Sequence, residues 1–136
     1  MADVEITAAS VVKGSDAVTG EGILGVAATA GQAVYKDASD ADKLRLADAN
    51  AATPANAVKG ILLNGGGIGQ TAEYQTSGRL TIGGTLVKGK PYFLSATAGG
   101  ICPWEDLESG CKVIELGIAT TTGEIDVRLF DPGVTL

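Results

Sequence analysis

The sequence contains no histidine, and this absence removes much of enzyme chemistry. Histidine is the commonest general base, the usual activator of serine and cysteine nucleophiles, and a ligand in nearly every catalytic zinc site. Carboxylates would have to replace it, and Glu105, Asp106 and Glu108 do cluster beside Trp104, a composition that resembles glycosidases. Neighbours in sequence rarely face each other across a substrate, so we interpret this stretch as an acidic loop held to the core by Trp104 and Leu107. We expect a non-enzymatic protein without a cofactor, with a carboxylate-based hydrolase as the alternative.

Cysteines and aromatic residues are scarce. Cys102 and Cys111 are too few for a disulfide framework or a four-thiolate zinc site, so we predict two buried thiols, with a local disulfide as the alternative. Aromatic residues make up 4% of the chain against 45% for all hydrophobic residues, so the core must consist largely of Val, Ile, Leu and Ala. Each of these side chains buries less area than an aromatic ring. We therefore expect burial between the subunits of an oligomer to add stability.

The sequence has no cluster of basic residues and no long apolar stretch. Ten Lys and Arg residues stand against 16 Asp and Glu, which gives a net charge of −6. A protein that neutralises phosphates needs the opposite sign, so we expect no nucleic-acid partner. The first residues, MADVEITAAS, carry Asp3 and Glu5 where a signal peptide would be positive, and no segment approaches membrane-spanning length. These features predict synthesis in the cytosol and no membrane partner.

Glycine is abundant, with 20 residues, and the segments between the glycines alternate between apolar and polar residues. In residues 124–130, for example, Ile125 and Val127 alternate with Asp126 and Arg128, as in a strand with one buried face. By the same criteria strands are predicted at residues 4–7, 22–27, 33–35, 43–46, 58–63, 71–75, 79–82, 91–95, 112–119 and 124–130. Helix is nearly absent, because Pro54 interrupts the alanine-rich stretch. We predict one all-β domain over residues 1–136, a small β-barrel or β-sandwich of short antiparallel strands.

Two stretches of the chain are similar to each other. AGQAVY leads to Lys59-Gly60-Ile61, and KGKPYF leads to Leu116-Gly117-Ile118, with 29 and 28 residues between the corresponding glycines. Both stretches continue through a turn into a strand that contains an acid, near Glu73 in the first and Asp126 in the second. The pattern predicts two duplicated units of strand, loop, strand, turn and strand.

Two loops have the composition of ligand sites. In GILLNGGGIGQTA the glycines fit the loose dinucleotide fingerprint, but the residues after Thr71 alternate as a strand, whereas the fingerprint requires a helix. We therefore predict a connection between strands. The run from Asp37 to Asp42 is acidic enough for calcium, but an EF-hand register beginning at Asp40 places Leu44 and Ala51 at ligand positions. A solvated hairpin loop is favoured there, with an irregular ion site as the alternative.

Several longer phrases resemble small head proteins of tailed bacteriophages. They are AGQAVYKDASDADKLRLADAN, AVKGILLNGGGIGQTAEYQTSGRLTIGGTLVKGKPYFLSATAGGI and CKVIELGIATTTGEIDVRL, which together span most of residues 25–129. Phrases of this kind occur in capsid decoration, or cement, proteins. The resemblance implies a β-rich protein of the virion that binds the outer surface of the major capsid protein lattice, as a dimer or trimer, and stabilises the mature head.

The surface that contacts the shell is predicted at the N-terminus. Val4, Ile6, Val11 and Val12 are the candidate contact residues, with residues 1–12 forming an N-terminal arm or an edge strand that pairs with a neighbouring sheet. An ordinary first strand of the same barrel is the alternative.

Similar phrases also occur in phage tail-fibre modules. The alternative function is therefore a tail or fibre module that binds a host surface glycan. Trp104 and Tyr92 would then form the stacking platform for the sugar.

Overall fold

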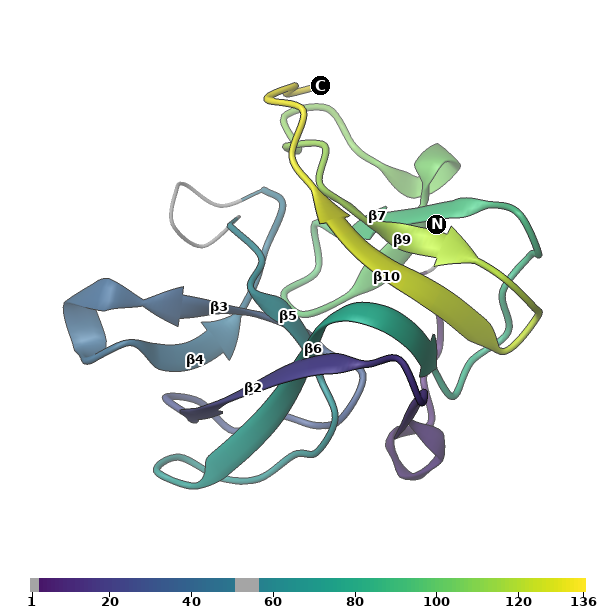
Figure 1. The fold of residues 1–136 in the computed structure, drawn as a ribbon. Coiled ribbons are helices and arrows are strands. Elements are labelled where there is room, and N and C mark those ends of the chain that lie inside the picture. Colours follow the sequence, from purple (N-terminus) through teal and green to yellow (C-terminus); the bar gives the residue numbers. More distant parts are fainter. Residues whose placement is uncertain (1–2, 51–56) are drawn as a thin grey trace.

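The strands of the protein form one antiparallel sheet that curls on itself (Figure 1). The structure, a computed structural model, describes residues 3–50 and 57–136. Within these residues the strands are β1 (Val12–Lys13), β2 (Val18–Ile23), β3 (Ala33–Asp37), β4 (Lys43–Leu46), β5 (Gly60–Leu62), β6 (Thr71–Thr81), β7 (Pro91–Leu94), β8 (Ile101–Pro103), β9 (Glu115–Ala119) and β10 (Glu124–Phe130). The only helical segments in this part of the chain are three short 3-10 turns, η1 (Ala8–Ser10), η2 (Ala38–Asp40) and η3 (Trp104–Asp106). The prediction of an all-β fold with short antiparallel strands and little helix is confirmed; Pro54 lies outside the described residues.

Several predicted strand boundaries are wrong. Residues 4–7 form no strand, and the segment predicted at residues 22–27 begins earlier, as β2. Every residue of β2 is at least partly exposed and two are glycines, so β2 has no buried face to mark it. The strands predicted at 71–75 and 79–82 are one continuous strand, β6, which passes through Gly78. The short strands β1 and β8 were not predicted.

The order of strands in the sheet repeats. The sheet runs β4-β3-β5-β6-β10-β9-β7-β8, so one half reads β4-β3-β5-β6 and the other, from its own edge, reads β8-β7-β9-β10. Each half begins with a hairpin, β3–β4 in the first and β7–β8 in the second. The next strand in the sequence, β5 or β9, pairs with the first strand of the hairpin, and a longer strand, β6 or β10, follows. The long strands β6 and β10 pair with each other and join the two units. The predicted duplication is confirmed at the level of topology.

The pairing register repeats as well. Val34 of β3 lies opposite Gly60 of β5, and Tyr92 of β7 lies opposite Gly117 of β9. Both glycines are positions of close approach, because a Cβ at Gly60 would lie 2.7 Å from the carbonyl oxygen of Gln75, and one at Gly117 would overlap the carbonyl oxygen of Asp126. The two similar phrases thus build the same contact twice. As predicted, both phrases lead into a strand that contains an acid, Glu73 in β6 and Asp126 in β10, and the register aligns Asp126 with Gln75.

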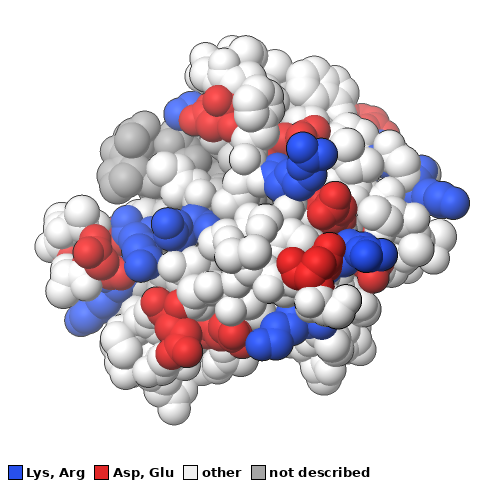
Figure 2. Space-filling model, in the orientation of Figure 1, with Lys and Arg blue, Asp and Glu red and all other residues white. Residues whose placement is uncertain are grey.

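The two faces of β10 differ as the alternation predicted. Ile125 and Val127 are buried, whereas Asp126 and Arg128 lie on the opposite, accessible face. In Figure 1 β9 and β10 lie at the front, and Figure 2 shows acidic and basic side chains interspersed on that side of the molecule. The outer face of the second unit therefore has no large area of one charge.

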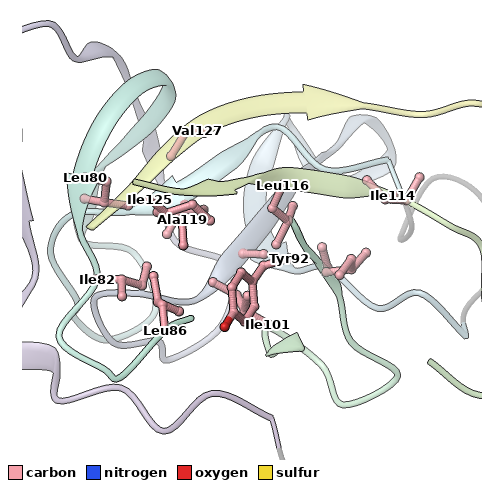
Figure 3. Packing of buried hydrophobic residues seen from close by; sticks show 14 of the residues in the cluster. Leu80, Ile82, Leu86, Tyr92, Ile101, Ile114, Leu116, Ala119, Ile125 and Val127 are labelled. Carbon is pink, nitrogen blue, oxygen red and sulfur yellow. The ribbon is translucent and has the colours of Figure 1, made fainter. Parts of the chain in front are cut away.

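The inner face of the second unit packs on the first unit and forms the larger core (Figure 3). Ile125 and Tyr92 of the second unit meet there with Ala33, Ile61 and Leu80 of the first unit. A smaller core lies within the first unit, where the sheet curls so far that Leu24, just after β2, forms a bridge with Leu44 of β4. Both cores are mainly aliphatic, as the composition predicted.

A bend in β6 allows one sheet to line both cores. Tyr74, before the bend, packs in the smaller core, and Leu80, after it, packs in the larger core. Gly78 adopts a positive φ of 94° at the bend. The amide nitrogen of fully buried Gln75 donates to the carbonyl oxygens of Gly78 and Arg79, both at 2.9 Å. These bonds tie the buried Gln75 amide to the backbone beyond the bend, where the carbonyl oxygen of Arg79 also accepts from the backbone nitrogen of Gly14 at 2.8 Å.

Candidate functional site

The N-terminal segment lies along the protein's own core. Val4 and Ile6 are partly buried against the larger core, and Val11 is buried in it. The backbone nitrogen of Val4 donates to Ile101 at 2.7 Å, and Asp3 accepts a hydrogen bond of 2.5 Å from Ser95. Val4, Ile6 and Val11 are thus packed against the same chain, whereas Ala8, Ala9 and Val12 of this segment are exposed. The contact of residues 1–12 with a shell stays a prediction.

Val12 is the one predicted contact residue that faces outward. Its side chain is 57% exposed, and it lies in β1, which pairs only with β6 among the described strands. β1 (Val12–Lys13) is thus an edge strand, and it shares only Val12 with residues 1–12, for which an arm or edge strand was predicted. The neighbouring Lys13 forms an ion pair of 3.4 Å with Glu73 and flanks this edge. Edge strands of this kind offer a row of backbone groups to an added strand.

The acidic run is a hairpin loop, as predicted. It forms η2 between β3 and β4, and its Asp37 and Asp40 side chains are engaged by Ser39 and by Arg45 of β4. The carboxylate of Asp37 accepts a hydrogen bond of 2.6 Å from the Ser39 hydroxyl, which, with the nearby Arg45 guanidinium, lowers its pKa. Asp40 accepts from Arg45 at 2.7 Å. These contacts fix the shape of the turn.

The glycine-rich loop connects two strands, as predicted. β5 ends at Leu62 and β6 begins at Thr71, so a strand stands where a dinucleotide site needs a helix. Within the loop, Gln70 accepts a hydrogen bond of 2.6 Å from the backbone nitrogen of Gly67. Gly66 pairs with Ala28, which ties the loop to the smaller core.

The two rings proposed as a sugar platform are not presented together. Trp104 is 51% exposed and packs edge-on against Phe93, with ring centroids 5.4 Å apart, so it is not held in the core as predicted. Tyr92 is only 3% exposed, and its hydroxyl accepts a hydrogen bond from the backbone nitrogen of Val87 at 2.9 Å. A platform built from Trp104 and Tyr92 is therefore wrong.

The carboxylates beside Trp104 do not converge on one point. Glu105 forms an ion pair with Lys90, and the hydrogen bond from that ammonium group lowers the pKa of Glu105. One carboxylate oxygen of Asp106 is buried without a partner among the described residues, whereas Glu108 is exposed. Glu105 is thus held in the charged form by a salt bridge.

Both cysteines are buried free thiols, which confirms the prediction. Burial raises the pKa of Cys102 to about 12, and the nearby Asp3 and Asp106 carboxylates add to the effect. The thiolate is the reactive form, so Cys102 presents almost none of it at neutral pH in the folded protein.

We expect neither thiol to react with a disulfide reagent such as DTNB in the folded protein. The shift of the Cys102 pKa from 9.0 to about 12 alone lowers its thiolate fraction about a thousandfold. Both thiols should react within the mixing time once a denaturant is added. Rapid modification of Cys102 or Cys111 before unfolding, located by mass spectrometry, would contradict this account of their burial.

The outer face of β9 and β10 carries an apolar area that was not predicted from the sequence. Phe130 is 60% exposed and Ile118 is 42% exposed, although both are large hydrophobic residues. A signal for Phe130 was available, because the alternation that buries Ile125 and Val127 places residue 130 on the outer face. Ile118 lies opposite Asp126, which is also on that face.

Comparisons with known proteins give no further identification. No protein-family model matches the sequence, and no curated protein is significantly similar to it. The described part of the chain contains no helix with the length and apolar character needed to cross a lipid bilayer.

Proposed function

We propose that the protein is a phage capsid decoration protein that binds the outer surface of the major capsid protein lattice and stabilises the mature head. The observation that carries this proposal is that the phage-like phrases form the paired strands of the sheet. AGQAVY forms the turn into β3, KGILLN contains β5, GKPYFLS contains β7, and ELGIATTTGEIDVRL contains β9 and most of β10. The resemblance therefore falls on the framework strands of both units.

The mechanism we propose is stabilisation by binding. A subunit that binds the mature lattice, and binds other forms of the shell more weakly, stabilises the mature form by the difference in binding free energy. The stabilisation of the shell increases with the number of copies bound to it. A net charge of −6 also disfavours a position against packaged DNA, which supports a location on the outer surface of the virion.

The contact that we propose with the shell is the edge strand β1. Val12 offers an exposed apolar side chain there, and β1 pairs with β6 alone among the described strands. Val4, Ile6 and Val11 contribute indirectly, because their packing against the core fixes the chain that leads into β1. A strand of the capsid protein could then extend the sheet at this edge.

The test uses heads that lack this protein. We expect the wild-type chain to cosediment with such heads and to raise their rupture temperature. Val12→Asp should weaken binding by at least about tenfold, because a charge buried at an apolar contact costs more than about 1.4 kcal/mol. Ile68→Asp, at an exposed position in the glycine-rich loop, is the matched control and should bind normally.

The outcomes separate attachment from cementing. Failure of the wild-type chain to cosediment with heads would refute the proposed function. Binding with an unchanged rupture temperature would refute cementing. Normal binding by Val12→Asp would place the contact elsewhere on the molecule.

A further inference from the structure

The outer face of β9 and β10 is an apolar surface that no described segment of the chain covers. We call it the outer β9–β10 face and define it by Glu115, Ile118, Arg128, Leu129 and Phe130, which line one hollow of about 300 Å³. Phe130 is the most exposed of the large hydrophobic residues in this set. Phe130 also borders a second hollow of about 230 Å³, which it lines together with Val58 and Ile114.

The duplicated fold gives a reason to expect that this face is covered. Ile118 pairs with Pro91 in the second unit as Ile61 pairs with Ala33 in the first. Ile61 and Ala33 are fully buried, because the second unit packs on that face of the first. The same face of the second unit has no described segment packed over Ile118. The face that carries Ile61 in the first unit is thus covered by the second unit, whereas the equivalent face that carries Ile118 in the second unit is open.

The shape of the face is suited to a second copy of itself. Phe130 borders both hollows, so a ridge and a hollow lie side by side. In a two-fold dimer the same surface of each subunit faces the other in the opposite direction. The ridge of each subunit can therefore fill the hollow of its partner. A single exposed aromatic side chain that enters a pocket is also the typical anchor of a protein interface.

The charges of the face are complementary to those of a second copy. Arg128 and Glu115 line the same hollow, and neither belongs to an ion pair among the described residues. Figure 2 shows both signs of charge on the side of the molecule that carries β10. A partner of one sign would satisfy only one of these two side chains, whereas an inverted copy satisfies both.

We propose that the protein forms a two-fold dimer through the outer β9–β10 face. Phe130 of each subunit occupies the hollow of the other, against Ile118 and Leu129, and Arg128 pairs with Glu115 of the partner subunit. This interface goes beyond the proposed function, because it requires no shell and leaves β1 free.

The first test measures the mass of the isolated chain by sedimentation velocity over a concentration series. The wild type should be dimeric at the higher concentrations. Phe130→Glu should weaken dimerisation at least about 100-fold, since the substitution removes the anchor from both halves of the interface. Ile68→Glu, at an exposed position in the glycine-rich loop, should dimerise as the wild type does. Circular dichroism and thermal unfolding should show that the Phe130→Glu monomer is folded.

The second test exchanges charges and does not depend on the first. Arg128→Glu should dimerise poorly alone, and so should Glu115→Arg, because each places like charges opposite each other. An equimolar mixture of the two variants should form a heterodimer in which both pairs are again of opposite sign. Recovery in the mixture is specific to a two-fold contact between these two positions, and a loss of folding cannot produce it.

The proposal is overturned if the wild type remains monomeric at all concentrations. It is also overturned if Phe130→Glu dimerises like the wild type, or if the mixed charge variants fail to associate. A monomeric wild type whose Phe130→Glu variant binds heads poorly would assign this face to the shell. These measurements use the chain alone, so they test the dimer independently of the proposed function. The protein can dimerise without binding heads, and it can bind heads without dimerising.

Discussion

Gly117→Ala is expected to destabilise the protein by about 3 kcal/mol, a large effect for one added methyl group. The Cβ of the alanine would overlap the carbonyl oxygen of Asp126, which belongs to the backbone of β10 and cannot rotate away. β9 must then separate from β10, and buried Ile125 loses its packing. Equilibrium unfolding in urea, followed by circular dichroism, measures the loss as a lower midpoint at an unchanged slope.

Two comparisons support the interpretation of this result. Gly123→Ala adds the same methyl group where no atom lies within 4 Å, and it should change stability by less than about 0.5 kcal/mol. Gly60→Ala, at the equivalent position of the first unit, should again destabilise, because its Cβ would lie 2.7 Å from the carbonyl oxygen of Gln75. If Gly117→Ala proves as stable as Gly123→Ala, the close approach of β9 and β10 is wrong.

Gly78→Ala is expected to cost still more, about 4 kcal/mol, because two penalties combine at the bend of β6. A positive φ of 94° is strained for alanine by about 1 kcal/mol or more. The added Cβ would also overlap the carbonyl oxygen of Asp16, in the chain that leads into β2. Relief of this overlap has to open the bend, and the hydrogen bonds from Gln75 across it are then lost.

Gly69→Ala separates the two penalties. Gly69 has a φ of 89°, but no atom lies within 4 Å of the Cβ position, so only the backbone strain of about 1 kcal/mol applies. The difference between the two variants in thermal or urea unfolding measures the steric part. Equal losses in both would mean that β6 does not approach the Asp16 backbone as described.

The second unit was the easiest part of the fold to predict from the sequence. Residues 124–130 have one buried face, so Ile125 and Val127 show the period of two that identifies a strand. The repeated glycine phrases aligned the two units because Gly60 and Gly117 meet the same steric requirement. These features could be predicted because a local requirement restricts the residue type. In residues 124–130 the requirement is a buried face, and at Gly60 and Gly117 it is a close approach of the backbone.

The first thirty residues were harder, for a physical reason. β2 has two glycines and no buried face, and it is a strand because β6 offers it a continuous row of backbone partners. Val4 and Ile6 alternate with polar residues as in a strand, yet they lie beside β8 and next to Gly83, where only isolated backbone hydrogen bonds form. Pairing of this kind depends on the position of distant segments, and a local pattern does not contain that information.

The candidate surfaces were predicted only in part. Val12 was named and is exposed, whereas Val4, Ile6 and Val11 were named and are covered by the chain itself. Phe130 and Ile118 were not named, because exposure of a large apolar residue depends on what packs over its strand. Only the three-dimensional arrangement shows that the second unit covers the first, and that none of residues 3–50 and 57–136 lies over the outer face of the second unit.

Imaging of the particle tests the central claim most directly. Heads that lack the protein, mixed with the wild-type chain and examined by electron cryomicroscopy, should show added density of the size of this fold, repeated over the outer surface of the shell at symmetry-related positions. Density confined to the tail, or shells unchanged after mixing, would contradict the claim that the protein decorates the capsid.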